Sequence, residues 1–256
     1  MGPVALLEVR GLSKEFGGVK AVRGVDFVVR DGQIKAMIGP NGAGKTTIFN
    51  VISGVFPPSR GLVRFKGQPL SGLKPHAVAA LGIGRTFQTA QLFGEMTVLE
   101  NVMLGRHTRS RSGILASSLR SPGMRREEAE IREKSLAILE LVGLGEKAEW
   151  IAVSLPYGEQ RLTEIARALA MEPEILLLDE PAAGLNRREK ARLGELIRRL
   201  RARGITVLLV DHHMDLVMEI SDEVLVLNYG EKIAEGLPGD VQRHAGVIAA
   251  YLGEEE

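Results

Sequence analysis

The chain has 256 residues, of which 45% are hydrophobic and 25% charged, and its 33 Lys and Arg against 32 Asp and Glu give a formal net charge of +1. This composition is typical of a soluble globular protein and excludes a polyanion binder held by bulk charge. The absence of cysteine excludes disulfides, thiolate metal ligands and thiol nucleophiles. The longest charge-free stretch, Thr46–Ser59, has 14 residues and includes two prolines, so it is too short to span a bilayer. A lone membrane protein is therefore excluded, but a subunit that docks on one is not.

Apolar, β-branched runs in the first third of the chain predict four strands, at residues 4–9, 25–30, 34–38 and 62–65. A glycine-rich stretch follows the third of these strands, and the pattern of residues 45–51 is helical. Turn residues at 57–61 then precede the fourth strand.

The middle of the chain, from about residue 75 to residue 141, has a helical pattern with long charged stretches. The last third alternates again. It predicts a charged amphipathic helix at 187–203 and strands at 175–178, 205–210, 224–227 and 232–234. Apolar runs that alternate with helices favour a parallel α/β core, here interrupted by a mostly helical insert.

Residues 39–46 match the phosphate-loop motif G-x-x-x-x-G-K-[ST], and Thr47 continues into the helical pattern. Glycines let backbone N–H groups approach phosphates closely, and the positive end of the following helix points at the anion. Lys45 can reach the β and γ phosphates, and the Thr46 hydroxyl can hold Mg²⁺. The predicted nucleotide-binding residues are thus Gly39, Pro40, Asn41, Gly42, Ala43, Gly44, Lys45, Thr46 and Thr47. The motif alone leaves kinases, GTPases and ATPases open.

Two carboxylates, Asp179 and Glu180, follow the buried strand at 175–178. Ligands of open α/β sheets bind at the carboxyl ends of the strands, so both acids are predicted to face the nucleotide. Asp179 is then placed to bind Mg²⁺, and Glu180 to orient or deprotonate an attacking water. The alternative, a capped turn with two solvated acids, is disfavoured by the phosphate loop.

The segment Leu155–Arg161 lies about 20 residues before Asp179, and together with the two motifs above it resembles the ATP-binding subunit of ABC transporters. The resemblance covers essentially the whole chain. It implies an α/β fold with a P-loop NTPase (RecA-like) core, an antiparallel β subdomain and a helical subdomain insert. A single domain is expected over 1–256, with the core at about 1–88 and 165–256 and the insert at about 89–164.

The resemblance also implies residues that bind ATP held by a partner subunit. The family signature is L-S-x-G-[QE], and Leu155, Gly158 and Glu159 match it, with Tyr157 at the variable position. Pro156 replaces the serine that bonds the γ-phosphate in the family, which puts that contact in doubt. A second segment of this kind, the D-loop, ends at Asn186, where aspartate is commonest.

Three more positions follow from the resemblance. Gln88 resembles the Q-loop glutamine, a Mg²⁺ and water contact that also senses the membrane domain. His212 resembles the switch histidine that touches the γ-phosphate, and is favoured over His213 because it follows the strand directly through Asp211. Phe16 resembles the aromatic that stacks on adenine, although a bare aromatic is more often a core residue.

Within the family, residues 12–22, 85–93, 101–126 and 247–253 are most similar to the ATP-binding subunit of branched-chain amino-acid importers. That resemblance implies a homodimer or a heterodimer with a homologous ATP-binding subunit. It also implies integral membrane permease subunits, an indirect substrate-binding protein, and a peripheral location at the cytoplasmic face of the inner (cell) membrane. The alternatives are transport of an amide, urea or lipopolysaccharide, and a soluble ABC-type assembly ATPase.

The insert carries an uneven charge. Six arginines and no acid lie between Arg106 and Arg126, which leaves −5 for the rest of a +1 chain. A solvated surface loop explains this, but so does a face near anionic lipid at the cytoplasmic membrane surface. A nucleic-acid partner is not expected, because the segment has no aromatic residues for base stacking.

Overall fold

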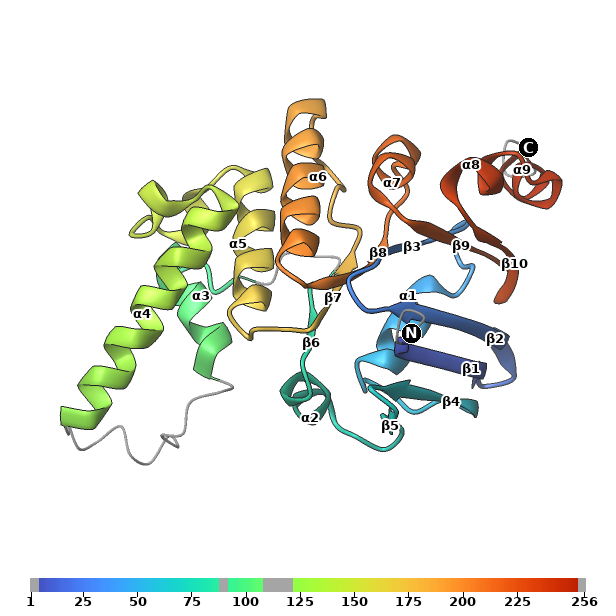
Figure 1. Cartoon of the computed structure of the whole chain (residues 1–256), viewed down its shortest axis with the longest axis horizontal. Coiled ribbons are helices and arrows are strands. Elements are labelled where there is room, and N and C mark those ends of the chain that lie inside the picture. The colour runs from blue at the N-terminus through green and yellow to red at the C-terminus, as the bar shows by residue number, and fades with distance from the viewer. Residues whose placement is uncertain (1–4, 88–91, 108–121, 253–256) are drawn as a thin grey trace.

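The computed structural model describes residues 5–87, 92–107 and 122–252 (Figure 1). Its larger sheet has the order β10-β9-β3-β8-β7-β6, in which every neighbouring pair is parallel except β9 and β10. The strands are β3 (Ile34–Ile38), β6 (Ile83–Arg85), β7 (Ile175–Asp179), β8 (Thr206–Val210), β9 (Glu223–Asn228) and β10 (Glu231–Gly236). The predicted parallel core is thereby confirmed.

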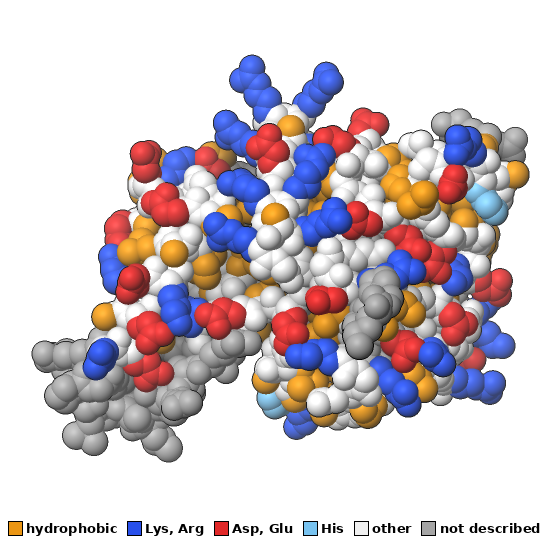
Figure 2. Space-filling model, viewed as in Figure 1, with side chains coloured by type: hydrophobic (Ala, Val, Ile, Leu, Met, Phe, Trp, Pro, Cys, Tyr) orange, Lys and Arg blue, Asp and Glu red, His pale blue; other side chains and the backbone are white. Residues whose placement is uncertain are grey.

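The strands β3, β7 and β8 are buried at every position, as continuous apolar runs predict for a sheet covered on both faces. Alternate residues of these strands belong to two cores. One core packs against α6 (Arg187–Ala202) and α7 (Met214–Ile220), and the other against α1 (Lys45–Ile52). The helix α6 is amphipathic as predicted, with leucines beneath and exposed arginines outside, and Figure 2 shows these cations gathered over it.

A smaller antiparallel sheet, of order β2-β1-β4-β5, covers the α1 face of the core. Its strands are β1 (Ala5–Phe16), β2 (Val19–Arg30), β4 (Arg60–Phe65) and β5 (Gln68–Pro69). The first two are much longer than the predicted 4–9 and 25–30. Register shifts, for example between Val9 and Leu12, break the two-residue alternation on which that prediction relied.

The helical part contains α3 (Val98–His107), α4 (Pro122–Val142), the 3₁₀ turns η2 (Gly145–Lys147) and η3 (Ala152–Ser154), and α5 (Tyr157–Leu169). The predicted boundary at residue 164 falls inside α5, which is a single helix. The prediction of helix throughout 75–141 is wrong at β6, which follows the short helix α2 (Pro75–Ala80) and pairs with β7. Three residues are too few to display a strand period.

The chain continues beyond β10 as α8 (Pro238–Gln242) and α9 (Ala245–Leu252), which contact β9 and β10. None of the helices in the described ranges has the combined length and apolar character that crossing a membrane requires.

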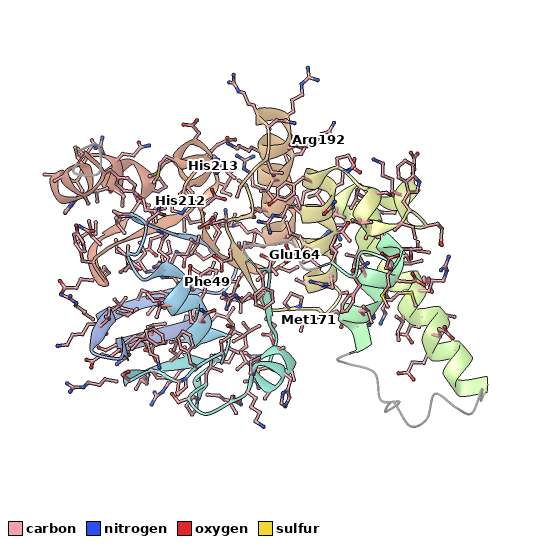
Figure 3. All side chains as sticks on the ribbon, turned by 180° about the vertical axis from the view of Figure 1, so that it is seen from behind. Phe49, Glu164, Met171, Arg192, His212 and His213 are labelled. Atoms are coloured by element: carbon pink, nitrogen blue, oxygen red, sulfur yellow. The ribbon has the colours of Figure 1, made fainter. Side chains whose placement is uncertain are left out.

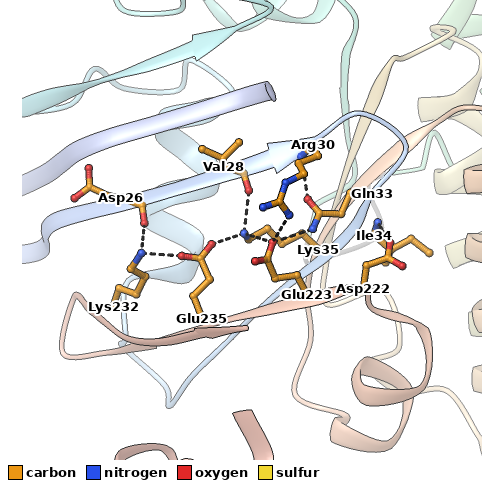
Figure 4. A network of polar contacts seen from close by, with 10 residues as sticks. All are labelled: Asp26, Val28, Arg30, Gln33, Ile34, Lys35, Asp222, Glu223, Lys232 and Glu235. Atoms are coloured by element: carbon orange, nitrogen blue, oxygen red, sulfur yellow. Dashed lines mark hydrogen bonds and ion pairs between the residues drawn. The ribbon is translucent and has the colours of Figure 1, made fainter. Parts of the chain in front are cut away.

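A buried lysine joins the two sheets (Figure 4). Lys35 lies on β3 and is 1% exposed. Its Nζ donates to the Val28 carbonyl of β2 at 2.9 Å and to Glu223 Oε2 of β9 at 2.9 Å, and it also contacts Glu235 of β10. Lys232 shares Glu235 at 2.7 Å. Four strands thus meet at one ammonium group.

Opposing effects act on Glu223. Burial raises its pKa, while hydrogen bonds from Lys35 and Gln33 lower it, and the net result is a pKa below the ordinary value. The carboxylate therefore stays charged because Lys35 is present.

We expect Lys35→Ala to lower the free energy of unfolding by about 3 kcal/mol, because the half-buried Glu223 and Glu235 would lose the buried cation they share and keep only the more exposed Arg30 and Lys232. The matched control is Lys66→Ala, whose ion pair with Glu174 is half exposed, and it should cost less than about 1 kcal/mol. Urea unfolding followed by circular dichroism measures both changes.

The same variant should show a defined pH dependence. A lowered pKa in the folded chain means that the contribution of Glu223 is present near neutral pH and is lost as the pH falls through that pKa. Without Lys35 the Glu223 carboxylate takes up a proton more readily, because the hydrogen bond and charge that lower its pKa are lost. The difference in unfolding free energy between the wild type and Lys35→Ala should therefore become smaller as the pH falls from about 7 to about 4.5. A difference that does not change with pH would contradict this prediction.

Candidate functional site

The phosphate loop joins β3 to α1, and two of its glycines have no room for a side chain. Gly39 has φ 148°, and a Cβ there would lie 2.1 Å from the Leu227 carbonyl oxygen. Gly44 has φ 98°, and its Cβ would lie 2.6 Å from the Ala21 oxygen. No side-chain cap hydrogen bond closes the N-terminus of α1. The N-terminus of α1 thus lies directly at the loop, as an anion site requires.

The loop borders an open cavity of about 280 Å³. Lys45 is buried at its edge, where Nζ donates to the Gly39 carbonyl at 2.5 Å and to the Pro40 carbonyl at 2.8 Å. Two residues distant in sequence, Glu180 and His212, join the loop in the lining. The complete lining is Ala21, Asn41, Gly42, Ala43, Gly44, Lys45, Thr46, Thr47, Glu180 and His212.

Glu180 follows β7 in the left-handed backbone region, with φ 48°. Such a conformation is costly for a residue other than glycine, so surrounding contacts must hold it. Its N–H donates to the Val210 carbonyl at 2.8 Å, and its Oε1 lies 3.1 Å from His212 Nε2. The turn directs Glu180 into the cavity, away from its neighbour Asp179.

The two adjacent histidines, which are labelled in Figure 3, have different partners. His213 donates through its backbone N–H to Asp211 Oδ1 at 2.9 Å, and its Nδ1 lies 2.7 Å from the same oxygen. Asp211 Oδ2 accepts from the Ala182 N–H at 2.9 Å. His213 is therefore directed at the buried Asp211, and His212 is the histidine that reaches Glu180.

Asp179 is 2% exposed, and its two oxygens differ. Oδ2 accepts from Arg85 Nη2 at 3.1 Å. Oδ1 is buried and has no hydrogen-bond partner within the described ranges. Burial raises the pKa of Asp179, and the charge and hydrogen bond of Arg85 oppose that rise. Thr46 lines the cavity and Asp179 does not, although both acids were predicted to face the nucleotide. A buried carboxylate oxygen without a partner nevertheless suits a hard oxygen-binding cation such as Mg²⁺, as the Thr46 hydroxyl does.

The signature segment borders no part of the cavity described above. Leu155 is buried in the core, and Pro156 is the N-cap of α5, where it supplies no side-chain hydrogen bond. Gly158 packs so closely on α6 that a Cβ would lie 2.7 Å from Glu189 Oε1. Tyr157 is exposed.

Two residues predicted to contact ATP in a partner have partners in their own chain. Both carboxylate oxygens of Glu159 accept from Lys147 Nζ at 2.6 Å. Asn186 is the N-cap of α6: its Oδ1 accepts from the N–H groups of Arg188 and Glu189, and Glu189 completes a capping box. The spacing Asn-x-x-Glu predicts this cap, and sequence reasoning missed it.

Two predicted contacts remain predictions. Gln88 lies outside the described residues. The ring of Phe16 is 44% exposed, meets Phe56 edge-on at 5.1 Å between centroids, and lies 5.0 Å from Lys14 Nζ. It does not line the phosphate-loop cavity.

A buried ion pair on α5 bonds both backbone polar groups of Phe87, the residue before Gln88. The sequence did not predict this contact. Arg161 Nη1 donates to the Phe87 carbonyl at 2.9 Å, and Glu164 Oε1 accepts from the Phe87 N–H at 3.2 Å. The two side chains also pair, with Arg161 Nη1 3.1 Å from Glu164 Oε2. Burial raises the pKa of Glu164, against the lowering effect of these hydrogen bonds. The motifs alone carry no sign of this contact.

Known proteins resemble the chain along nearly its whole length. The family described as ABC transporter matches residues 22–183, and the family described as branched-chain amino acid ATP-binding cassette transporter matches residues 231–256. The chain is 47% identical over 250 residues to the high-affinity branched-chain amino acid transport ATP-binding protein BraF of Pseudomonas aeruginosa. That alignment covers 97% of this chain and 98% of the relative.

Solved structures agree. A nucleotide-free ATP-binding cassette from an ABC transporter has a TM-score of 0.86 at 33% identity, covering 97% of this chain and 99% of that one. A dimeric cassette in a post-hydrolysis state, bound to ADP and Pi, has a TM-score of 0.77 at 26% identity, covering 91% and 98%. With a phosphate loop, Glu180 and His212 at one cavity, the chain belongs to the ABC transporter family as one of its ATP-hydrolysing ATP-binding cassettes.

Proposed function

We propose that this cassette powers the uptake of branched-chain amino acids. The similarity to BraF and the match of residues 231–256 to the branched-chain amino acid family support the substrate. The cavity that the phosphate loop shares with Glu180 and His212 supports ATP hydrolysis as the source of energy. We infer transport across the inner (cell) membrane, with this chain peripheral at its cytoplasmic face.

In this proposal ATP is bound between two subunits. The phosphate loop of one chain supplies Lys45, and the partner supplies the N-terminus of α5 with the Gly158 N–H. The signature segment does not line the cavity of its own chain, which is the arrangement that a head-to-tail pair needs. The dimeric cassette bound to ADP and Pi supports such a pair, formed by two copies or by this chain and a homologous subunit.

Glu180 is the proposed general base. Its carboxylate lines the cavity and can polarise a water for attack on the γ-phosphate, while His212 Nε2, 3.1 Å from Oε1, holds the carboxylate in position. Thr46, Asp179 and Gln88 are the proposed Mg²⁺ ligands, directly or through water. Mg²⁺ would neutralise charge on the β and γ phosphates.

Exposed apolar side chains offer a surface for the proposed permease. Phe93, Trp150 and Val153 are each more than half exposed. The chain pairs Thr97 with Ile151 and bonds the Val153 N–H to the Gly94 carbonyl, so the two segments that carry these side chains run side by side. An apolar surface beside the signature helix fits a cytoplasmic helix of a membrane partner.

The first arginine of the basic segment is buried in its own chain. Arg106 is 8% exposed, and its Nη1 pairs with Glu172 at 2.8 Å, so the expectation that it faces lipid or solvent is wrong. The next arginines, Arg109 and Arg111, lie outside the described residues.

Glu180→Gln should still bind ATP and form a stable dimer, because the change removes a negative charge beside the phosphates. It should hydrolyse ATP at least about 100-fold more slowly, because the general base is lost. Phosphate release and light scattering measure the two properties. Glu195→Gln, on the exposed face of α6, is the matched control and should behave as the wild type. Near-normal turnover of Glu180→Gln would show that Glu180 is not the base.

The same variant tests the substrate in cells. When Glu180→Gln replaces the native chain, uptake of labelled leucine should fall to the background level, while uptake of glucose should not change. Intact leucine uptake together with lost uptake of urea would show that the substrate is wrong although the ATPase is right.

Pro156→Ser should strengthen the site. The backbone at this N-cap has φ −52° and ψ 149°, which serine adopts readily, and its hydroxyl can cap α5 for about 1 kcal/mol of stability. It also restores a donor for the γ-phosphate bound in the partner. We expect a higher unfolding midpoint and dimers at lower ATP concentration in Glu180→Gln. A gain in stability without any gain in dimer formation would contradict the contact across the dimer.

A further inference from the structure

Arg85 bridges two elements beneath the cavity. It comes from β6, and its side chain is 7% exposed. Nη1 donates to Asn50 Oδ1 on α1 at 2.7 Å and to Ser53 Oγ, at the C-cap of that helix, at 2.6 Å. Nη2 donates to Asp179 Oδ2 at 3.1 Å, at the end of β7. One rigid guanidinium thus holds the helix of the phosphate loop against the strand that carries Asp179.

Two aromatic rings fix the position of this guanidinium. Its Cζ lies 5.8 Å from the ring centroid of Phe49 and 5.0 Å from that of Phe87. Planar, delocalised guanidinium groups are suited to such stacking, and the fork of donors serves two partners at once. A lysine at this position has one nitrogen and could not reach both α1 and Asp179 with the same geometry.

The hydrogen bonds of Arg85 affect the positions of two candidate metal ligands, the Asp179 carboxylate and the Thr46 hydroxyl. Because Arg85 occupies Oδ2 of Asp179, the carboxylate is oriented with Oδ1 left without a partner in the described part of the chain. Thr46 precedes Asn50 by four residues on α1, so the two side chains lie on the same face of that helix. Holding Asn50 therefore also holds Thr46 at a set distance from Asp179.

We propose that Arg85 is a positioning residue that fixes the Asp179 carboxylate and the Thr46 hydroxyl relative to each other, so that both oxygens meet the Mg²⁺ of bound ATP. This inference rests on the proposed function. Residues that orient metal ligands typically contribute about 10- to 100-fold to metal affinity. Arg85 should therefore affect the metal-dependent part of ATP binding and leave the metal-free part intact.

The test measures the affinity for labelled ATP by equilibrium dialysis, with Mn²⁺ and with EDTA, in the Glu180→Gln background so that ATP stays intact. The ratio of the two affinities is the gain that the metal provides. Arg85→Gln should reduce this gain by about 10-fold or more and leave the affinity in EDTA within about twofold of the parent. Arg85→Lys should be intermediate, and Asn50→Ala should show a smaller loss.

Arg106→Gln is the matched control, because Arg106 is also a buried arginine paired with a carboxylate, but on α3. It should keep both affinities. If Arg85→Gln lost ATP affinity equally with Mn²⁺ and with EDTA, or if the ratio of the two affinities did not change, the inference would be overturned and the proposed function would still stand. A parent chain that bound no ATP would overturn the proposed function itself.

Discussion

The phosphate loop requires glycine at two of its positions, because backbone oxygens occupy the space into which a side chain would project. The Leu227 oxygen of β9 lies against Gly39, and the Ala21 oxygen of β2 lies against Gly44. Side chains can move aside, but the backbone of packed strands cannot. The loop is thereby fixed between the two sheets, and this fixes the direction of α1 and the places of Lys45 and Thr46.

The strand order then brings the remaining chemistry to the loop. β3 pairs with β8, and β8 pairs with β7, all parallel, so their carboxyl ends share one edge. Gly39 follows the first of these strands, Asp211 and His212 follow the second, and Glu180 follows the third. Residues far apart in sequence line one cavity because three adjacent strands end beside each other.

Motifs with fixed spacing were predictable from the sequence, whereas buried charges were not. The phosphate loop, the pair Asp179–Glu180 and His212 each depend on a few neighbouring residues, and the structure gathers most of them at one cavity. Arg85 and Lys35 find their partners about 94 and 188 residues away, so no local pattern reveals them.

Local signals account for the other differences. The capping box at Asn186 was predictable from four residues, because Asn and a Glu three positions later at a helix start are its usual sequence. The strand β6 was not readable, because three residues show no period and their partner strand lies about 90 residues further on. Bulges hid most of β1 and β2 from a search for strict alternation.

We propose that ATP is shared between the phosphate loop of one chain and the signature helix of another. Since the chain has no cysteine, a variant with Asn41→Cys and Tyr157→Cys, both at exposed positions, has no competing thiols. In the Glu180→Gln background, oxidation should link the variant into dimers when ATP is present and leave monomers when it is absent. Equal cross-linking with and without ATP would contradict this arrangement, and no cross-linking in either case would contradict its formation by two copies of this chain.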